Sequence, residues 1–148
     1  MNPSGTIGEI LSHKGTQVWS VSPDTTVFDA IQMMAEKNVG ALLVVDNSKL
    51  IGIISERDYT RKVILQGKAS KQTAVKEILS SHLVEVSPAH SVEECLRLMT
   101  DRRVRHLPVL EEGRIVGVIS IGDLVNWIIS AQSTTINQLQ TYIAGYPG

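Results

Sequence analysis

The chain contains an internal repeat. When residues 21–60 are laid over residues 86–125, a shift of 65 positions without a gap, twelve of the forty pairs are identical. The identities include a Val-Ser-Pro string at the start of each window and a Gly-x-Ile-Ser-x-x-Asp string near its end. A repeat restricts the fold more than any local pattern, because each copy must adopt the same structure. The sequence therefore predicts two copies of one unit, over residues 5–66 and 73–130, followed by a helical tail over residues 131–148.

Each copy has the pattern of a β-α-β-β-α unit, so the predicted class is α/β. A short extended stretch stops at Ser-Pro, because proline lacks the N–H that a strand ladder needs. Apolar residues at helical spacing follow, and Thr25, Thr26 and Ser91 are candidate N-caps. Two aliphatic runs around a polar turn then predict a hairpin, and a second helix begins near residues 56 and 121. The predicted extended stretches and hairpin strands are residues 17–21, 41–45 and 50–54 in copy one, and 83–86, 107–110 and 115–119 in copy two.

The small size of the unit gives a physical reason for the duplication. A unit of about 60 residues buries too little surface to be comfortably stable alone. Two copies packed through their sheets, with pseudo-two-fold symmetry, would cover each other's aliphatic faces. We therefore expect one compact pair rather than two independent domains.

Composition excludes several classes of protein. The net charge is −1 and 43% of the residues are hydrophobic, which argues against global disorder and against a general nucleic-acid binder. No apolar run is long enough to cross a membrane, and the first residues lack a secretory pattern. The single cysteine, Cys95, lies in an apolar helical stripe and is expected to be a buried structural thiol. These features predict a cytoplasmic protein with no membrane partner.

Motifs for catalysis or metal binding are not apparent. The four histidines lack the spacing of metal ligands, and the sequence has no nucleophile elbow, phosphate-binding loop or dinucleotide fingerprint. No pair of base and nucleophile suggests itself. We therefore predict that the protein is not an enzyme and holds no metal.

The repeated Ser-x-x-Asp motif carries the clearest chemistry. Ser55 and Asp58, like Ser120 and Asp123, lie where a predicted strand turns into a helix. The first N–H groups of a helix have no partner within it, so this corner can receive a phosphate or sugar oxygen. The carboxylate can accept hydrogen bonds from a ribose diol. The same spacing is also typical of a capping box, which needs no ligand, so both interpretations stand.

The repeat as a whole resembles the cystathionine-β-synthase (CBS) domain. The resemblance rests on Val-x-x-Leu-x-Val before the hairpin and on residues 52–58 and 117–123, and it covers about residues 5–130. Two copies in tandem look like a Bateman module, and the strings over residues 40–46, 56–63 and 105–109 resemble small stand-alone bacterial CBS-pair proteins. The resemblance implies that Asp58 and Asp123 bind ribose and that Ser55 and Ser120 contact ribose or phosphate.

The two implied clefts should differ in charge. In nucleotide-binding CBS modules, basic residues at the positions of Arg105 and His106 often hold phosphates. Copy one has Gly40 and Ala41 there, so the cleft with Asp123 looks equipped for a charged nucleotide and the other looks more apolar. Ala41 is assigned to that second nucleotide site. Any positive charge there would have to come from Arg57, Arg61 or Lys62. The resemblance places adenine against the extended stretches, with these candidates: Thr16, Val18 and Trp19 for one cleft, and Leu83 and Val84 for the other.

These features predict a sensor or regulatory module for signal transduction. Its ligand would be AMP, ADP, ATP or an NAD-type dinucleotide, and occupancy would change conformation or assembly and thereby act on an unknown partner enzyme. The alternative is an interaction protein whose clefts are vestigial and which regulates a partner without nucleotide. Some apolar helical positions cannot be covered by two small sheets, and the resemblance implies a dimer, the common state of CBS pairs. Together these points predict a homodimer. The positions concerned are Phe28, Ile31, Leu124, Trp127 and Ile128, extended by the tail residues Ile136, Leu139 and Ile143.

Overall fold

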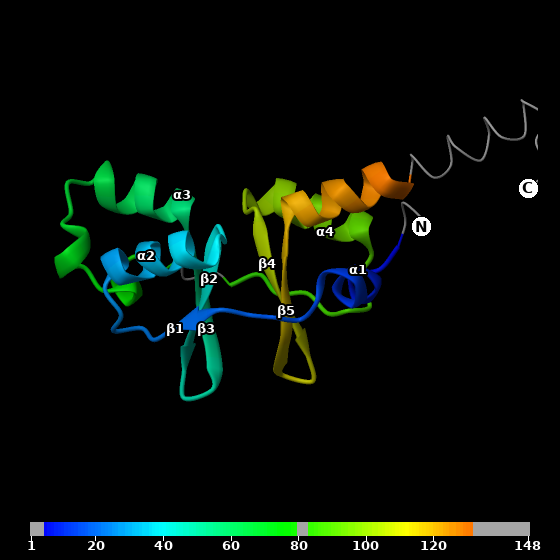
Figure 1. Ribbon diagram of the computed structural model, residues 1–148, viewed down its shortest axis with the longest axis horizontal. Coiled ribbons are helices and arrows are strands. Elements are labelled where there is room, and N and C mark those ends of the chain that lie inside the picture. The colour runs from blue at the N-terminus through cyan, green and yellow to red at the C-terminus, as the bar shows by residue number, and fades with distance from the viewer. Residues whose placement is uncertain (1–4, 80–82, 132–148) are drawn as a thin grey trace, which may run out of the picture. The chain divides into compact units, whose positions relative to one another are not determined.

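The computed structural model describes residues 5–79 and 83–131 (Figure 1). The chain forms two compact units. Unit 1 combines the N-terminal segment up to Thr16 with the chain from Glu85 onward, and unit 2 is Gln17–Val84. The predicted C-terminal tail, with Ile136, Leu139 and Ile143, lies outside the described residues.

Unit 2 contains a three-stranded sheet in the order β1-β2-β3. The strand β1 (Ser20–Val21) runs parallel to β2 (Ala41–Asp46), which pairs antiparallel with β3 (Lys49–Ser55). The helix α2 (Val27–Lys37) buries Val27, Ala30 and Met34 in the core. The second helix starts as α3 (Glu56–Tyr59) and continues as the π-helical turn η1 (Thr60–Ile64). Two 3₁₀ turns complete the unit: η2 (Ser70–Gln72) and η3 (Val75–Glu77).

Unit 1 repeats this arrangement. The helix α4 (Val92–Arg102) leads into the hairpin of β4 (His106–Glu111) and β5 (Arg114–Ser120), and residues 121–131 are helical. Val86 makes a parallel bridge to Val109, the place that Val21 and Val44 hold in unit 2. The unit also contains α1 (Ile7–Lys14), a helix that the sequence pattern did not reveal. The predicted α/β class, the two repeats and both hairpins are confirmed.

Local sequence explains where the long helices begin. The side chains of Thr26 and Ser91 accept hydrogen bonds from the N–H groups of Asp29 and Glu94, as N-caps do. Both helices end at a residue in the left-handed conformation, Asn38 or Arg103. Of the candidate N-caps, Thr26 and Ser91 are thus the ones used.

Each unit is completed by a segment that precedes the other copy in sequence. We call residues 5–16 and 73–79 the lead segments. Gly5 accepts a hydrogen bond from the N–H of Val92, and Thr73 accepts one from the N–H of Val27, both at 2.8 Å. The lead segment before copy one therefore packs on copy two, and the lead segment before copy two packs on copy one.

Glycines in the hairpins make room for the lead segments. A Cβ atom at Gly117 would lie 2.7 Å from Cδ2 of Leu11, and one at Gly52 would lie 2.9 Å from Cδ2 of Leu79. Both contacts are closer than real Cβ atoms make. The glycine in the repeated Gly-x-Ile-Ser string thus permits the close approach of a leucine from the lead segment.

The helix over residues 121–131 buries a different face from the one we expected. We expected Leu124 and Trp127 to face a second subunit, and this is wrong, because these residues are only 0% and 6% exposed in the chain. A Cβ atom at Gly5 would lie 2.8 Å from the indole, and the ring of His13 meets it edge-on. The exposed apolar side chains of this helix are Ile121, Val125 and Ile129. Across residues 5–79 and 83–131, no helix combines the length and the apolar character that a membrane span requires.

Candidate functional site

The Ser-x-x-Asp corner of unit 2 lies where β3 passes into α3. The Ser55 N–H donates to Oδ2 of Asp58 at 2.9 Å, and the Asp58 N–H donates back to Oγ of Ser55 at 3.2 Å. The Ser55 hydroxyl also contacts Oδ2 at 3.0 Å. This reciprocal pair is a capping box, so the capping interpretation of the motif is confirmed here.

The corresponding corner of unit 1 has the same geometry. The Ser120 N–H donates to Oδ2 of Asp123 at 2.8 Å, and the Asp123 N–H donates to Oγ of Ser120 at 3.1 Å. In both units the capping bonds use Oδ2 of the carboxylate. The two acid side chains keep 27% and 23% of their surface exposed, for Asp58 and Asp123 respectively. Each helix start therefore presents a fixed and accessible carboxylate, which can accept further hydrogen bonds.

The hairpin of unit 1 brings the predicted basic pair to this corner. His106 is the partner of Ser120 in the β4–β5 register, and the Arg105 carbonyl accepts the N–H of Ile121 at 2.8 Å. Arg105, His106, Ser120 and Asp123 thus meet at one strand end. In unit 2 the same places are held by Ala41, which pairs with Ser55, and by Gly40, whose carbonyl accepts the Glu56 N–H. The residues at the two strand ends therefore differ, with Arg105 and His106 in unit 1 and Gly40 and Ala41 in unit 2.

Two lysines beside the carboxylates complete the corners. The Lys14 ammonium donates to Oδ2 of Asp123 at 2.6 Å and to the Val118 carbonyl at 2.8 Å. Sequence reasoning missed Lys14, because it comes from the lead segment and lies 109 positions away from the acid. In unit 2, Lys62 lies 3.5 Å from Oδ1 of Asp58. Lys62 is one of the three basic residues that the sequence offers as a source of charge here, and its i,i+4 spacing from Asp58 brings the two side chains together.

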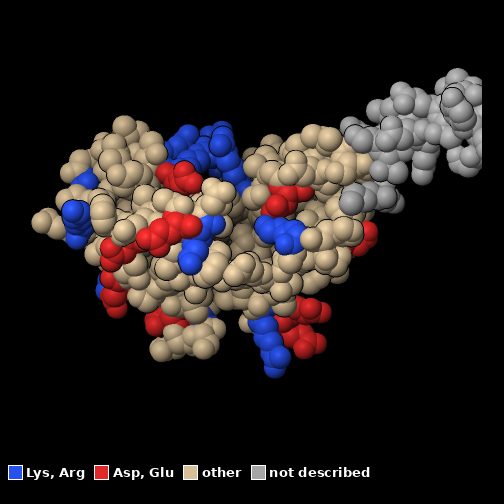
Figure 2. Space-filling model, viewed as in Figure 1, with Lys and Arg blue, Asp and Glu red and all other residues tan. Residues whose placement is uncertain are grey.

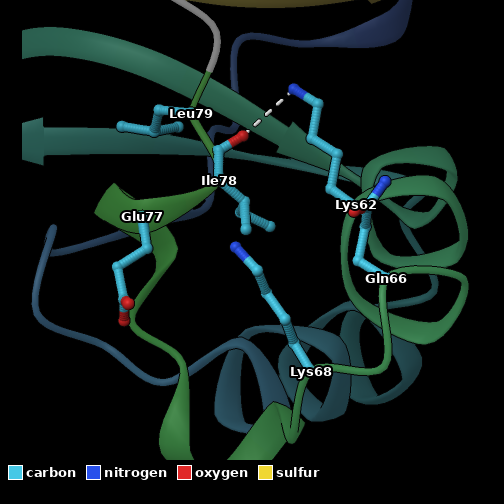
Figure 3. Close-up of a pocket in the computed structure, with 6 residues that line it drawn as sticks. All are labelled: Lys62, Gln66, Lys68, Glu77, Ile78 and Leu79. Atoms are coloured by element: carbon cyan, nitrogen blue, oxygen red, sulfur yellow. Dashed lines mark hydrogen bonds between the residues drawn. The ribbon is translucent and has the colours of Figure 1, made fainter.

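Each unit has a groove beside its second helix, and in unit 1 the motif acid Asp123 itself lines the groove. In unit 2 it has a volume of about 260 Å³ and is lined by Lys62, Gln66, Lys68, Glu77, Ile78 and Leu79 (Figure 3). Lys62 donates to the Ile78 carbonyl at 3.0 Å, and the ammonium ends of Lys62 and Lys68 lie on the groove side in this view. The unit 1 groove, of about 240 Å³, is lined by Ile10, His13, Lys14, Asp123, Asn126, Trp127 and Ser130. One groove is rich in lysine, while the other combines an aromatic wall with the Lys14–Asp123 pair.

The face of the molecule seen in Figure 2 carries mixed charge. Figure 2 shows Lys and Arg side chains interspersed with Asp and Glu side chains over the face in view. This agrees with the formal net charge of −1. The charged corners are therefore local features rather than parts of a single extended basic surface.

The candidate adenine-contacting residues occupy the stretches between elements. Thr16 is exposed after α1, whereas Val18, Leu83 and Val84 are half-buried. Trp19 is also half-buried and packs on the core of unit 2, with the Lys37 ammonium 4.3 Å from its ring centroid. Thr16 belongs to unit 1 and the other four to unit 2. That these residues bind adenine stays a prediction.

The cysteine is a structural residue rather than a reactive one. Cys95 is fully buried, and burial raises the pKa of its thiol to about 11, so the expected structural thiol is confirmed. Among the residues that the structure describes, no group of three or more His, Cys, Asp or Glu side chains is placed to hold a metal ion.

Comparison with known proteins adds independent evidence. The family model of the CBS domain matches residues 7–64 and 75–130. A mitochondrial CBS domain-containing protein of Arabidopsis thaliana, CBSX3, is 40% identical over 96% of this chain and 73% of its own length. The solved structure of a protein with CBS domains from Burkholderia ambifaria is 48% identical, with a TM-score of 0.82 over 86% of this chain and 96% of that chain.

A more distant structure shares the fold. It is a CBS-domain pair in complex with 5′-methylthioadenosine and S-adenosyl-L-methionine, 21% identical, with a TM-score of 0.76 over 86% of this chain and 98% of that chain. The Arabidopsis and Burkholderia relatives are named as CBS-domain proteins rather than as enzymes. Two matches of the family model, covering most of the chain, establish the family. The chain belongs to the CBS-domain family and is a tandem CBS-domain pair, a regulatory type of module.

Proposed function

We propose that the protein is a sensor of adenosine nucleotides. The observation that carries the proposal is the fixed carboxylate at each helix start, Asp58 in unit 2 and Asp123 in unit 1. Capping bonds hold each acid through Oδ2 while about a quarter of its side chain remains exposed. The exposed part of the carboxylate can accept hydrogen bonds from the two hydroxyls of a ribose.

The charge around the acids supports a phosphorylated ligand. In unit 1, Lys14 donates a hydrogen bond to Asp123. His106 pairs with Ser120 across the hairpin, and the Arg105 carbonyl accepts the N–H of Ile121. A guanidinium suits a phosphate because its planar fork can donate two parallel hydrogen bonds. We therefore assign AMP, ADP, ATP or an NAD-type dinucleotide to the corner at Asp123.

The ligands of one structural relative belong to the same chemical class. The CBS-domain pair of the 21% identical structure is in complex with two adenosine derivatives. That identity supports a shared fold, so the ligand of the present chain must be tested directly. Binding alone would not make a sensor, because a ligand shifts a conformational equilibrium only when its affinity differs between the two states.

The decisive experiment combines titration calorimetry with two variants of Asp123. Asp123→Ala removes the acceptor, and we expect adenosine nucleotides to bind more weakly by about 1 to 3 kcal/mol. Asp123→Asn keeps an oxygen for the Ser120 N–H, so it should lose affinity while its melting temperature stays close to that of the parent. The matched control is Asp24→Ala, which removes an exposed carboxylate that pairs with Lys76. Lower stability of Asp123→Ala with unchanged affinity would leave only the capping role.

A second function, docking of another chain, has its own observation. Ile121, Val125 and Ile129 are exposed by 40%, 42% and 54% and recur every fourth position along one helix. Positions four apart share a helix face, so these side chains form one apolar stripe. We propose that the stripe is part of the homodimer contact. Light scattering tests this, and a mass of 16.2 kDa with and without nucleotide would contradict it.

A further inference from the structure

Lys14 forms a short ion pair with Asp123, the predicted sugar-binding acid of unit 1. Its ammonium is 2.6 Å from Oδ2 of Asp123, the oxygen that also accepts the Ser120 N–H. A second hydrogen bond, to the Val118 carbonyl at 2.8 Å, fixes the ammonium from the strand side. The Lys14 side chain is 35% exposed, so it has room to reorient toward solvent. A cation thus shares the carboxylate with any hydroxyl that would donate to it.

Unit 2 reaches a similar arrangement from a different sequence position. Lys62 lies 3.5 Å from Oδ1 of Asp58 and donates to the Ile78 carbonyl at 3.0 Å. In the repeat, Lys62 corresponds to Trp127, a buried aromatic residue, so unit 1 has no lysine at this place on its helix. The cation of unit 1 comes from α1 instead. In each unit an ammonium group thus contacts both the motif acid and a backbone carbonyl. The two lysines do not correspond in the repeat, so the duplication alone does not explain the shared arrangement, which points to a role at the site.

The two ion pairs differ in strength. The Lys14 pair is a short, charge-assisted hydrogen bond, while the Lys62 pair is longer than a hydrogen bond. The backbone carbonyl of Arg105 accepts the N–H of Ile121, so a second basic residue adjoins the helix start that carries Asp123. A neutral nucleoside must compete with Lys14 for Asp123 and brings no charge in return. A nucleotide brings a phosphate that pairs with the ammonium when sugar hydroxyls take the carboxylate.

We propose that Lys14 selects phosphorylated nucleotides over neutral nucleosides at the Asp123 corner, an inference that rests on the proposed function. The lysine acts in two opposite directions. When a nucleoside binds, Lys14 competes with the sugar hydroxyls for the Asp123 carboxylate. When a nucleotide binds, Lys14 pairs with the phosphate. The ratio of the two affinities, rather than either affinity alone, therefore reports its role.

The test measures AMP and adenosine binding by calorimetry on the full chain in an Asp58→Asn background, which isolates the unit 1 site. Lys14→Met keeps the apolar stem and removes the charge. We expect AMP to bind more weakly and adenosine to bind as well or better, so that the AMP preference falls by about tenfold or more. Lys14→Arg should keep most of the preference, because it keeps the charge. The control Lys76→Met removes a 2.8 Å ion pair with Asp24 and should change neither affinity.

The outcomes separate the inference from the proposed function. If the parent binds AMP and Lys14→Met weakens AMP and adenosine by the same factor, the lysine only supports the local structure and the selectivity inference is overturned. An AMP preference unchanged within twofold overturns it as well. If the parent binds neither compound, the proposed function fails and the inference falls with it.

Discussion

The exchange of lead segments predicts an energetic coupling between residues far apart in sequence. Leu11 precedes copy one, yet it is 5% exposed and lies against Gly117 of copy two. Truncation of a buried leucine to alanine costs about 2 to 5 kcal/mol. About 2 kcal/mol of this is lost transfer free energy for the removed carbons, and the remainder depends on the cavity. We expect Leu11→Ala to destabilise unit 1 by this amount.

A double-mutant cycle makes the prediction specific. Gly117→Ala alone places a Cβ atom 2.7 Å from Cδ2 of Leu11, so the leucine must move and unit 1 loses stability. In the Leu11→Ala background the opposing atom is gone, and the new methyl group fills part of the cavity. The two changes should therefore be non-additive by about 1 kcal/mol or more. The pair Leu11→Ala with Gly52→Ala is the matched control and should be additive.

The two tryptophans supply the assay, because one lies in each unit. In a Trp19→Phe background, the fluorescence of Trp127 reports the urea unfolding of unit 1. The buried indole contacts His13 of the same lead segment, so its emission should change when α1 detaches. Coupling of Leu11 to Gly52 instead of Gly117 would refute the exchange of lead segments.

Three further predictions can be checked, two by substitution and one by labelling the parent protein. Arg105→Ala should weaken the binding of AMP more than that of adenosine, and equal losses in calorimetry would rule out a phosphate contact. Val125→Glu should reduce the mass seen by light scattering while the melting temperature stays near that of the parent. Trp127→Glu should instead lower the melting temperature, because it buries an unpaired carboxylate. Cys95 should resist alkylation at pH 8 in the folded protein, because burial raises its pKa to about 11 and keeps the thiol protonated; rapid labelling without denaturant would contradict this.

The sequence predicts the repeated part of the fold well, because local pattern decides it. The caps at Thr26 and Ser91 and the aliphatic runs of the hairpins are signals within a few residues of each other, and the structure uses them all. The Ser-x-x-Asp corners are found for the same reason. Arg105 and His106 reach the corner of unit 1 because hairpin register places residue 106 opposite residue 120.

The sequence does not predict which copy each lead segment packs on. Leu11 and Leu79 fit either hairpin by size, since both hairpins carry the same glycine. The association of Lys14 with Asp123 depends on that choice, so no local pattern contains it. The burial of Trp127 depends on it as well, because Gly5 and His13 of the lead segment cover the indole. A helical stripe shows that a face is apolar, but the element that covers the face is fixed only by tertiary structure.

The lead segment of unit 1 has a consequence for synthesis on the ribosome. Residues 7–14 are made before unit 2, but the surface on which they pack is made only with residues 85–131. A helix of eight residues is not stable alone in water. Its apolar residues Ile7, Ile10 and Leu11 therefore remain exposed to solvent until residues 85–131 have been synthesised. Unit 2 is continuous in sequence and can close before unit 1 is complete. The usual order, in which the earlier part of a chain folds first, is thus reversed for this segment: α1 is translated before unit 2 and packs only after unit 2 has been made.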